Sequence, residues 1–293
     1  MVQQPDEDFD GDHKLSGSHA GGRMNVTRPE VRFQHRKNLH RYGRTAARML
    51  LILLAVLCAP LRDSASDQVF ERTYPLQGGG SFLLENVNGS VEVDGWDRDE
   101  VEVRAVKVAR NGSPDLSQVQ IEVENHPSQV LVHTRYPRGE GAEVAVEYHI
   151  YVPSKILLSN VETVNGSVLV HGIDGGGDLR SVNGNVEVLK SAGRFSAKTT
   201  NGNVRLELSG LGDGAPMNVE TVNGSVVLGL PSGTRANLNV LNLNGEFSSE
   251  LPVTPTLTSA GARTFRGKLG VGGGEISVRT INGTIRLIRQ PSV

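Results

Sequence analysis

Apolar and polar residues alternate in short runs along most of the chain after residue 69. One run places Val101, Val103 and Ala105 at every second position, and polar turn signals such as Asn111-Gly112 separate the runs. This alternation predicts β-strands with one buried face and one exposed face. We therefore expect an all-β protein.

A six-residue phrase with Asn-Gly at its centre recurs along the chain. The asparagine lies at positions 165, 183, 201, 223, 244 and 282, and an earlier copy has it at position 88. The later spacings are 18, 18, 22, 21 and 38 residues, and the last equals two units of 19. One copy near residue 263 is therefore expected to have lost its Asn-Gly pair. A nearly fixed period of about 20 residues is typical of stacked supersecondary units.

The side of the chain that carries apolar residues changes at each Asn-Gly pair. Counted from the asparagine, position −4 is apolar and position −2 is small and polar, whereas positions +3 and +5 are mostly apolar. We expect positive φ at both residues of the pair, because glycine adopts it freely and asparagine tolerates it. The predicted structural turns are Asn88, Gly89, Asn165, Gly166, Asn183, Gly184, Asn201, Gly202, Asn223, Gly224, Asn244, Gly245, Asn282 and Gly283.

Two arrangements satisfy this change of side. In a two-residue hairpin, position −2 would pair with position +3 across the turn. In a β-solenoid, each strand would pair with the same position one repeat away. The repeats are nearly equal in length and match position by position, which favours a single-stranded solenoid, or β-helix, of about six to seven short coils. A hairpin meander or sandwich is the alternative.

The first part of the chain differs from the repeats. Residues 1–48 are polar and become basic, which predicts a disordered basic leader or a mis-assigned start. Residues 49–66 hold a short apolar run that ends before Pro60 and cannot cross a hydrocarbon core of about 30 Å, so they predict a signal peptide or a short anchor. Residues 67–158 are predicted to form an antiparallel β unit that includes the first coil, and residues 159–293 to form the solenoid repeats.

Candidate chemistry is sparse. With 30 basic and 32 acidic residues, the charge does not point to nucleic acid as a partner. Cys58 is the only cysteine, which excludes a disulfide framework and a cysteine-based metal site within the chain. His133, His149 and His171 lack metal-ligand spacing, so we expect no metal, no cofactor and no catalytic residues. Trp96, the only tryptophan, is predicted to cover the edge of the core.

Three stretches of the sequence resemble a known bacterial family. They are Gly95–Val103, the Thr-Val-Asn-Gly-Ser-Val copies, and Gly267–Gly283. The family is the "putative adhesin" group of β-strand-repeat domains of unknown function, related to the head-GIN adhesin-like domains. The resemblance covers about residues 70–293 and implies an extracytoplasmic, right-handed β-helix-like fold. It implies no activity and no catalytic residues.

These observations predict an exported, non-enzymatic, adhesin-like module with a binding or structural role in the cell envelope, in the periplasm or at the cell surface. The expected partner is an envelope glycan or protein, and the membrane is involved only through the N-terminal segment. One alternative is a membrane-anchored sensory or accessory domain of the envelope. A less favoured one is a β-helix enzyme that cleaves polysaccharides, which would need two carboxylates about 5–10 Å apart in a groove.

The C-terminal strand is expected to lie at an open edge of the solenoid. Arg286, Arg289 and Pro291 would discourage pairing between copies there, because charge and proline protect exposed strand edges. We therefore predict a monomer.

Overall fold

The computed structural model describes residues 68–110, 115–137, 143–212, 216–258 and 263–290. The predicted leader and the predicted signal segment lie outside the described residues. The described residues belong to one compact unit, Asp63–Val293, and the regular elements among them are β-strands and one 3₁₀ turn, Leu116–Gln118. None of its described elements is a helix of the length and apolarity needed to cross a membrane.

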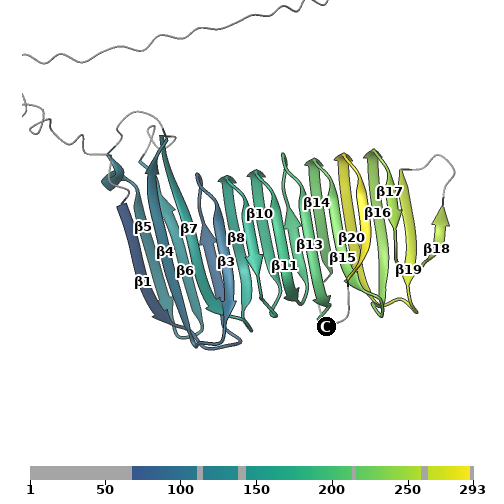
Figure 1. Cartoon of the computed structure of the whole chain (residues 1–293), viewed down its shortest axis with the longest axis horizontal. Coiled ribbons are helices and arrows are strands. Elements are labelled where there is room, and N and C mark those ends of the chain that lie inside the picture. Colours follow the sequence, from purple (N-terminus) through teal and green to yellow (C-terminus); the bar gives the residue numbers. More distant parts are fainter. Residues whose placement is uncertain (1–67, 111–114, 138–142, 213–215, 259–262, 291–293) are drawn as a thin grey trace, which may run out of the picture. The chain divides into compact units, whose positions relative to one another are not determined.

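The strands form two large mixed sheets (Figure 1). Sheet A contains, in spatial order, β1 (Gln68–Pro75), β4 (Glu100–Ala109), β7 (Val144–Pro153), β3 (Val91–Trp96), β9 (Val168–His171), β11 (Val186–Ala192), β13 (Val204–Gly210), β15 (Val226–Pro231), β21 (Ile285–Gln290) and β17 (Phe247–Ser249).

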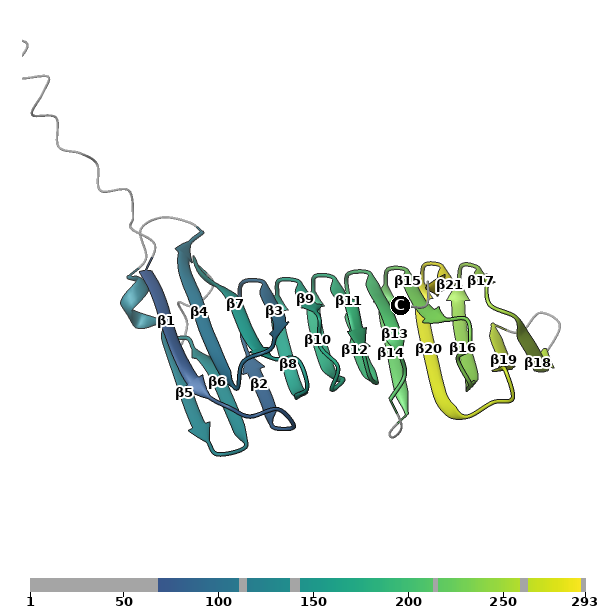
Figure 2. The same ribbon diagram turned by 60° about the horizontal axis from the view of Figure 1, so that its bottom comes forward.

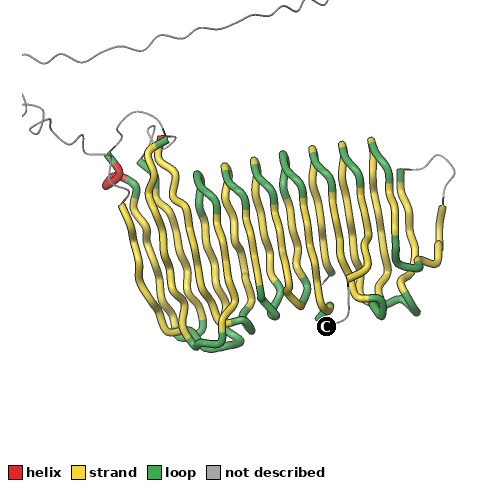
Figure 3. The backbone as a smooth tube through the Cα atoms, viewed as in Figure 1, coloured by secondary structure: helices red, strands yellow, loops and turns green. Residues whose placement is uncertain are grey.

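Sheet B contains, in spatial order, β18 (Val253–Thr258), β19 (Thr264–Leu269), β16 (Ala236–Asn244), β20 (Gly274–Asn282), β14 (Met217–Asn223), β12 (Phe195–Lys198), β10 (Gly177–Asn183), β8 (Leu157–Asn165), β2 (Ser81–Glu85), β6 (Gln129–Arg135) and β5 (Gln120–His126). Green turn segments join strands along both long edges of the sheets (Figure 3).

Each repeat contributes one strand to each sheet, and its strands pair in parallel with those of neighbouring repeats. In sheet B, Asn183 pairs with Asn165, and in sheet A, Val186 pairs with Val168. The two strands that flank one Asn-Gly pair, such as β8 and β9, lie in different sheets. The hairpin alternative is therefore wrong, because it required these two strands to pair with each other.

Aliphatic residues from both sheets form one core. In the repeat around Asn165, the buried positions are Val161 before the turn and Val168 and Val170 after it. These are the positions −4, +3 and +5 of the sequence pattern, and they are buried in the other repeats except that around Asn244, where Phe247 is half-buried and Ser249 is exposed. Burying such side chains contributes about 1.5–3 kcal/mol each, which makes the repeated pattern the main source of stability.

The last coils do not follow the order of the chain. Strands β20 and β21 lie between the pair β14–β15 and the pair β16–β17 (Figure 2). Strands β16 and β17 follow β15 in the chain but do not pair with β14 and β15. The position next to β14 and β15 is occupied by β20 and β21, which come last in the chain. Because β21 has a strand on each side, the prediction that Arg286 and Arg289 protect an open edge is wrong, and Pro291, the third residue of that prediction, lies outside the described residues.

The predicted coil near residue 263 is also wrong. Strands β18 and β19 occupy this part of the chain, and β19 pairs antiparallel with both β18 and β16. They extend sheet B only, with Pro255 on the outermost strand. Proline lacks an N–H group and is tolerated at such an edge.

The N-terminal end also departs from chain order. Strands β6 and β7 pair in parallel with β2 and β3, so they form a coil that has no Asn-Gly pair. Beyond it, β4 pairs antiparallel with β7, β5 with β6, and β1 with β4. The strands expected to form an antiparallel unit in residues 67–158 therefore continue the same two sheets as the repeats.

Candidate functional site

The asparagines of the Asn-Gly pairs form one hydrogen-bonded row. Each Nδ2 donates to the Oδ1 of the preceding asparagine in the row, at 2.8–2.9 Å. A carboxylate could not continue the row, because it accepts but does not donate. In space the row runs through Asn88, Asn165, Asn183, Asn201, Asn223, Asn282 and Asn244.

A second row is formed by the hydroxyl groups at position −2. Each hydroxyl donates to the carbonyl oxygen of the turn glycine in the preceding coil, at 2.8–2.9 Å. All these side chains are buried, so the bonds satisfy polar groups that would otherwise cost about 1–3 kcal/mol each. The donors are Thr163, Ser181, Thr199, Thr221 and Thr280.

Glycine is required at these turns by the neighbouring coil. A Cβ atom on Gly202 would lie 2.1 Å from the carbonyl oxygen of Gly184, and one on Gly184 would lie 2.0 Å from that of Gly166. None of the asparagines in the row has positive φ, and of their glycines only Gly89, Gly245 and Gly283 do. The prediction of positive φ at both residues of each pair is therefore wrong, and close stacking explains the glycine instead.

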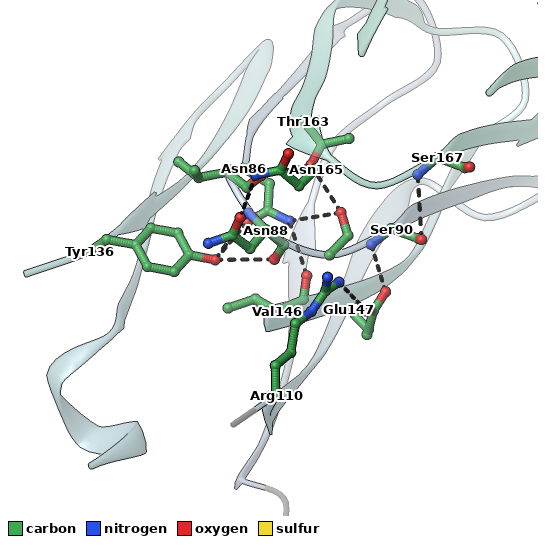
Figure 4. Close-up of polar contacts among 12 residues, drawn as sticks. Asn86, Asn88, Ser90, Arg110, Tyr136, Val146, Glu147, Thr163, Asn165 and Ser167 are labelled. Carbon is green, nitrogen blue, oxygen red and sulfur yellow. Dashed lines mark hydrogen bonds and ion pairs between the residues drawn. The ribbon is translucent and has the colours of Figure 1, made fainter. Parts of the chain in front are cut away.

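The first turn of the row meets the coil that has no Asn-Gly pair (Figure 4). At position −2 of this repeat, Asn86 replaces the serine or threonine of the middle repeats, and its Nδ2 donates to the carbonyl of Val146 at 3.0 Å. The hydroxyl of Tyr136 donates to the carbonyl of Asn88 at 3.1 Å. At the other end of the row, Asn242 donates to the carbonyl of Gly283 at 3.2 Å. The two rows therefore direct their polar groups along the stack rather than outward to a ligand.

Four titratable side chains meet on the outer face of sheet A. Glu92 and Asp94 lie on β3, His149 on β7 and His171 on β9, and we call this group the carboxylate–histidine cluster. His149 Nε2 lies 2.8 Å from Asp94 Oδ2, and His171 Nδ1 lies 3.5 Å from Asp94 Oδ1. One ligand atom from each of Glu92, Asp94 and His149 lies within 4.8 Å of the other two, so these three residues could hold one metal ion.

Aromatic side chains pack beside the cluster. Trp96 and Tyr151 are stacked with their ring centroids 5.2 Å apart, and Tyr151 lies 4.6 Å from the ring of His149. The guanidinium of Arg98 lies 4.7 Å from the Trp96 ring centroid, and Trp96 Nε1 donates to the carbonyl of Glu100 at 2.8 Å. Trp96 is not part of the apolar core, so its predicted place at the edge of the core is wrong.

A shallow groove of about 460 Å³ opens on the same face. Strands β3, β4, β7 and β9 all contribute to it. Carboxylate, imidazole and guanidinium groups line it together with aliphatic side chains, so it offers both donors and acceptors. The lining includes Glu92, Arg104, Glu147, His149 and Leu169.

Comparison with known proteins gives distant similarities only. No family model matches the sequence, and no curated protein matches it. A "putative cell adhesion protein" from Clostridium sporogenes ATCC 15579 is 12% identical, with 76% of this chain and 100% of that chain covered and a TM-score of 0.42.

Two further solved structures are similar at the same level. A "putative adhesin" from Bacteroides fragilis NCTC 9343 is 11% identical over 77% of this chain and 99% of that chain, with a TM-score of 0.37. A "putative lipid binding protein" from Parabacteroides distasonis ATCC 8503 is 10% identical over 75% of this chain and 97% of that chain, with a TM-score of 0.33. At these identities and TM-scores, the similarities do not place the chain in a family.

Sequence reasoning missed the carboxylate–histidine cluster, although part of it was visible. Asp94 and His171 both lie six residues after the asparagine of their repeat, so stacking of equal positions brings them together. His149 lies in the coil without an Asn-Gly pair, and nothing in the repeat pattern places it beside them. On the other sheet, sheet B, His133 pairs with Glu85, with Nδ1 3.0 Å from Oε2.

Proposed function

We propose that residues 68–290 form a right-handed, single-stranded β-solenoid in an exported, non-enzymatic, adhesin-like protein of the cell envelope. Its proposed role is to bind an envelope glycan or protein through the outer face of sheet A. The observation that carries this proposal is the groove beside Glu92 and His149, where donor and acceptor groups from several strands converge on an accessible surface.

The rigid scaffold beneath the groove supports this role. The parallel pairing of equal repeat positions, and the asparagine and hydroxyl rows, hold neighbouring coils in one register. A surface that is already ordered binds a ligand without a further entropy cost for ordering it. The groove is therefore suited to recognition by fixed polar groups.

A binding experiment with a matched control tests the proposal. The purified protein would be applied to a glycan array and used to capture partners from an envelope fraction. Arg104→Glu changes the charge of the groove, whereas Arg180→Glu makes the same change on an exposed position of β10 in sheet B. We expect the first variant to lose at least about tenfold in affinity, a difference of about 1.4 kcal/mol, and the second to bind normally. Equal loss in both variants, or no partner in either assay, would refute the proposal.

One observation favours the enzymatic alternative. The carboxylates of Glu92 and Asp94 lie within 4.8 Å of each other, which is close to the separation of about 5–5.5 Å in retaining glycosidases. However, both oxygens of Asp94 face imidazoles, so this carboxylate is not placed to protonate a leaving group. Release of reducing ends from envelope polysaccharides by the native protein, but not by Asp94→Asn, would revive the alternative.

The N-terminal sequence of the mature protein tests whether it is exported through a cleaved signal. Sequencing of the protein recovered from the envelope is expected to show a start after Ser66, as for a cleaved signal. Retention of Met49–Leu61 would instead favour the membrane-anchored sensory or accessory domain.

A further inference from the structure

We propose that Glu92, Asp94 and His149 form a binding site for one divalent transition-metal ion, with Zn²⁺ as the reference ion. Their ligand atoms lie within 4.8 Å of one another, and they are the one group of this kind among the described residues. The site is separate from the Asn-Gly turns, whose polar groups bond to one another. It also does not depend on which envelope partner the protein binds.

The backbone holds the three ligands in fixed relative positions. Glu92 and His149 are direct neighbours on the parallel strands β3 and β7, and Asp94 lies two residues further along the same face of β3. The ring of His149 packs against Tyr151, which restricts its rotation. Ligands on paired strands are positioned more accurately than ligands on loops.

The donor set matches the chemistry of zinc. Imidazole nitrogen and carboxylate oxygen bind Zn²⁺ at about 2.0–2.2 Å, so tetrahedral ligands lie about 3.3 Å apart. The present separation of 2.8 Å between His149 Nε2 and Asp94 Oδ2 requires only a small side-chain rotation to admit the ion. Binding would also neutralise two carboxylates that share one site. A mixed nitrogen and oxygen set favours zinc and its transition-metal neighbours over Ca²⁺ and Mg²⁺, which prefer oxygen alone.

His171 acts in this proposal as a positioning residue. Its Nδ1 lies 3.5 Å from Asp94 Oδ1, whereas His149 faces the other oxygen of the same carboxylate. A side chain that contacts a metal-binding carboxylate from the outside orients it, and loss of such a partner typically weakens metal binding by about 10–100-fold.

Three protein ligands leave part of the coordination sphere open. A tetrahedral ion would carry one water molecule or one donor from outside the protein. Glu92 and His149 also line the groove, so this open position is next to a surface that can admit another molecule. The chemical class of such a ligand is a carboxylate, hydroxyl or imidazole donor.

The test uses the whole protein after treatment with a chelator. Calorimetric titration with Zn²⁺ is compared between the native chain and the variants Asp94→Asn, His149→Gln and His171→Gln. We expect one Zn²⁺ per chain to be lost in the first two variants, and its affinity to fall by about 10–100-fold in the third. Any sites contributed by other histidines are common to all these proteins, so the difference between native and variant isolates this site.

Trp96 provides a second readout because it is the only tryptophan. It stacks on Tyr151, which in turn contacts His149, so a paramagnetic ion such as Co²⁺ bound there should quench its fluorescence. Quenching is expected to saturate with one ion in the native protein. It should not saturate over the same range in His149→Gln.

His133→Gln is the matched control. His133 is also paired with a glutamate on the outer face of a sheet, but it belongs to no group of three ligands among the described residues. It should bind Zn²⁺ as the native protein does, and circular dichroism establishes that every variant is folded. The proposal is overturned if the folded native protein binds no Zn²⁺ at 1 mM (about the weakest affinity of interest). It is also overturned if Asp94→Asn and His149→Gln leave the stoichiometry unchanged, or if His133→Gln loses as much.

Discussion

The middle of the stack and its two ends are built from similar strands but are ordered by different rules. From β8 to β15, each repeat stacks on the repeat before it in the chain, and a serine or threonine bonds to the neighbouring glycine carbonyl. At both ends, a coil stacks out of chain order, and antiparallel strands lie beyond it. Asn86 and Asn242 replace the hydroxyl residue at these ends.

This difference shows what a repeated phrase can and cannot specify. Repeats of similar sequence can each pair with any other repeat. The repeated motif therefore sets how two repeats stack, but it does not set which two repeats are neighbours. The strands beyond the repeats pair antiparallel, and the order of the coils is seen only in the strand pairing of the folded chain. The carboxylate–histidine cluster depends on this, since His149 reaches Asp94 only because β7 stacks on β3 out of chain order.

The largest expected effect comes from adding one methyl group to the middle of the stack. Gly202→Ala would place a Cβ atom 2.1 Å from the carbonyl oxygen of Gly184 and force the two coils apart. We expect the free energy of unfolding, measured by urea denaturation, to fall by about 3 kcal/mol. Gly210→Ala is the control, because no atom lies within 4 Å of its added Cβ. Equal stability of the two variants would contradict the close stacking.

An exchange of the residues at position −2 tests the difference between middle and end directly. Thr199→Asn introduces a longer side chain into a fully buried site and is expected to cost about 2 kcal/mol of unfolding free energy. Asn86→Thr shortens the end residue, so that it loses its bond to the Val146 carbonyl, at a cost of about 1 kcal/mol. If asparagine were tolerated at position 199, the two environments would not differ as described.

If the asparagine row acts as a chain of hydrogen bonds, replacing an asparagine in its middle should cost more unfolding free energy than replacing one at its end. Asn201 donates to Asn183 and accepts from Asn223, whereas Asn244 donates to Asn282 at the end of the row. Both side chains are exposed, so each bond should contribute about 0.5 kcal/mol, near the lower limit for a hydrogen bond. Thermal and urea unfolding of Asn201→Ala should therefore show about twice the loss seen for Asn244→Ala. An equal loss would show that the row does not act as a chain of bonds.

The smallest expected effect is a pH dependence at the N-terminal end. Burial of Tyr136, which bonds to the Asn88 carbonyl, raises its pKa to about 12 from an ordinary value near 10. The folded protein then holds this proton where the unfolded chain releases it. The stabilising contribution is complete below about pH 10 and is lost as the pH rises to about 12.

The measurement compares unfolding free energies of the native protein and Tyr136→Phe between pH 9 and 12 (roughly the window in which a raised tyrosine pKa acts). The native protein should lose more stability with rising pH than the variant. Burial also lowers the pKa of Lys107, and this shift makes the folded protein more stable as the pH rises. Lys107 is present in both proteins, so its contribution cancels in the difference between them. Parallel curves would contradict a raised pKa for Tyr136.

The sequence by itself determined the all-β class, the inward positions of each repeat and the places of the Asn-Gly turns. These properties depend on local alternation and on a phrase that recurs about every twenty residues, so a single chain displays them. It also gave Asp94 and His171 the same offset of six residues from the asparagine of their repeats. Their contact depends on the pairing of β3 with β9, which the repeat period does not specify.

Only the tertiary structure decided the order of the coils and the composition of the outer face. The parallel coil formed by β6 and β7 carries no Asn-Gly pair, and the C-terminal strands β20 and β21 lie between earlier ones. The reason for glycine in the turns is also seen only in the tertiary structure. Gly202 does not have a positive φ, and the carbonyl of the neighbouring coil lies too close to admit a Cβ atom there. Contacts between residues far apart in the chain depend on which strands pair, and equal repeats make several pairings locally equivalent.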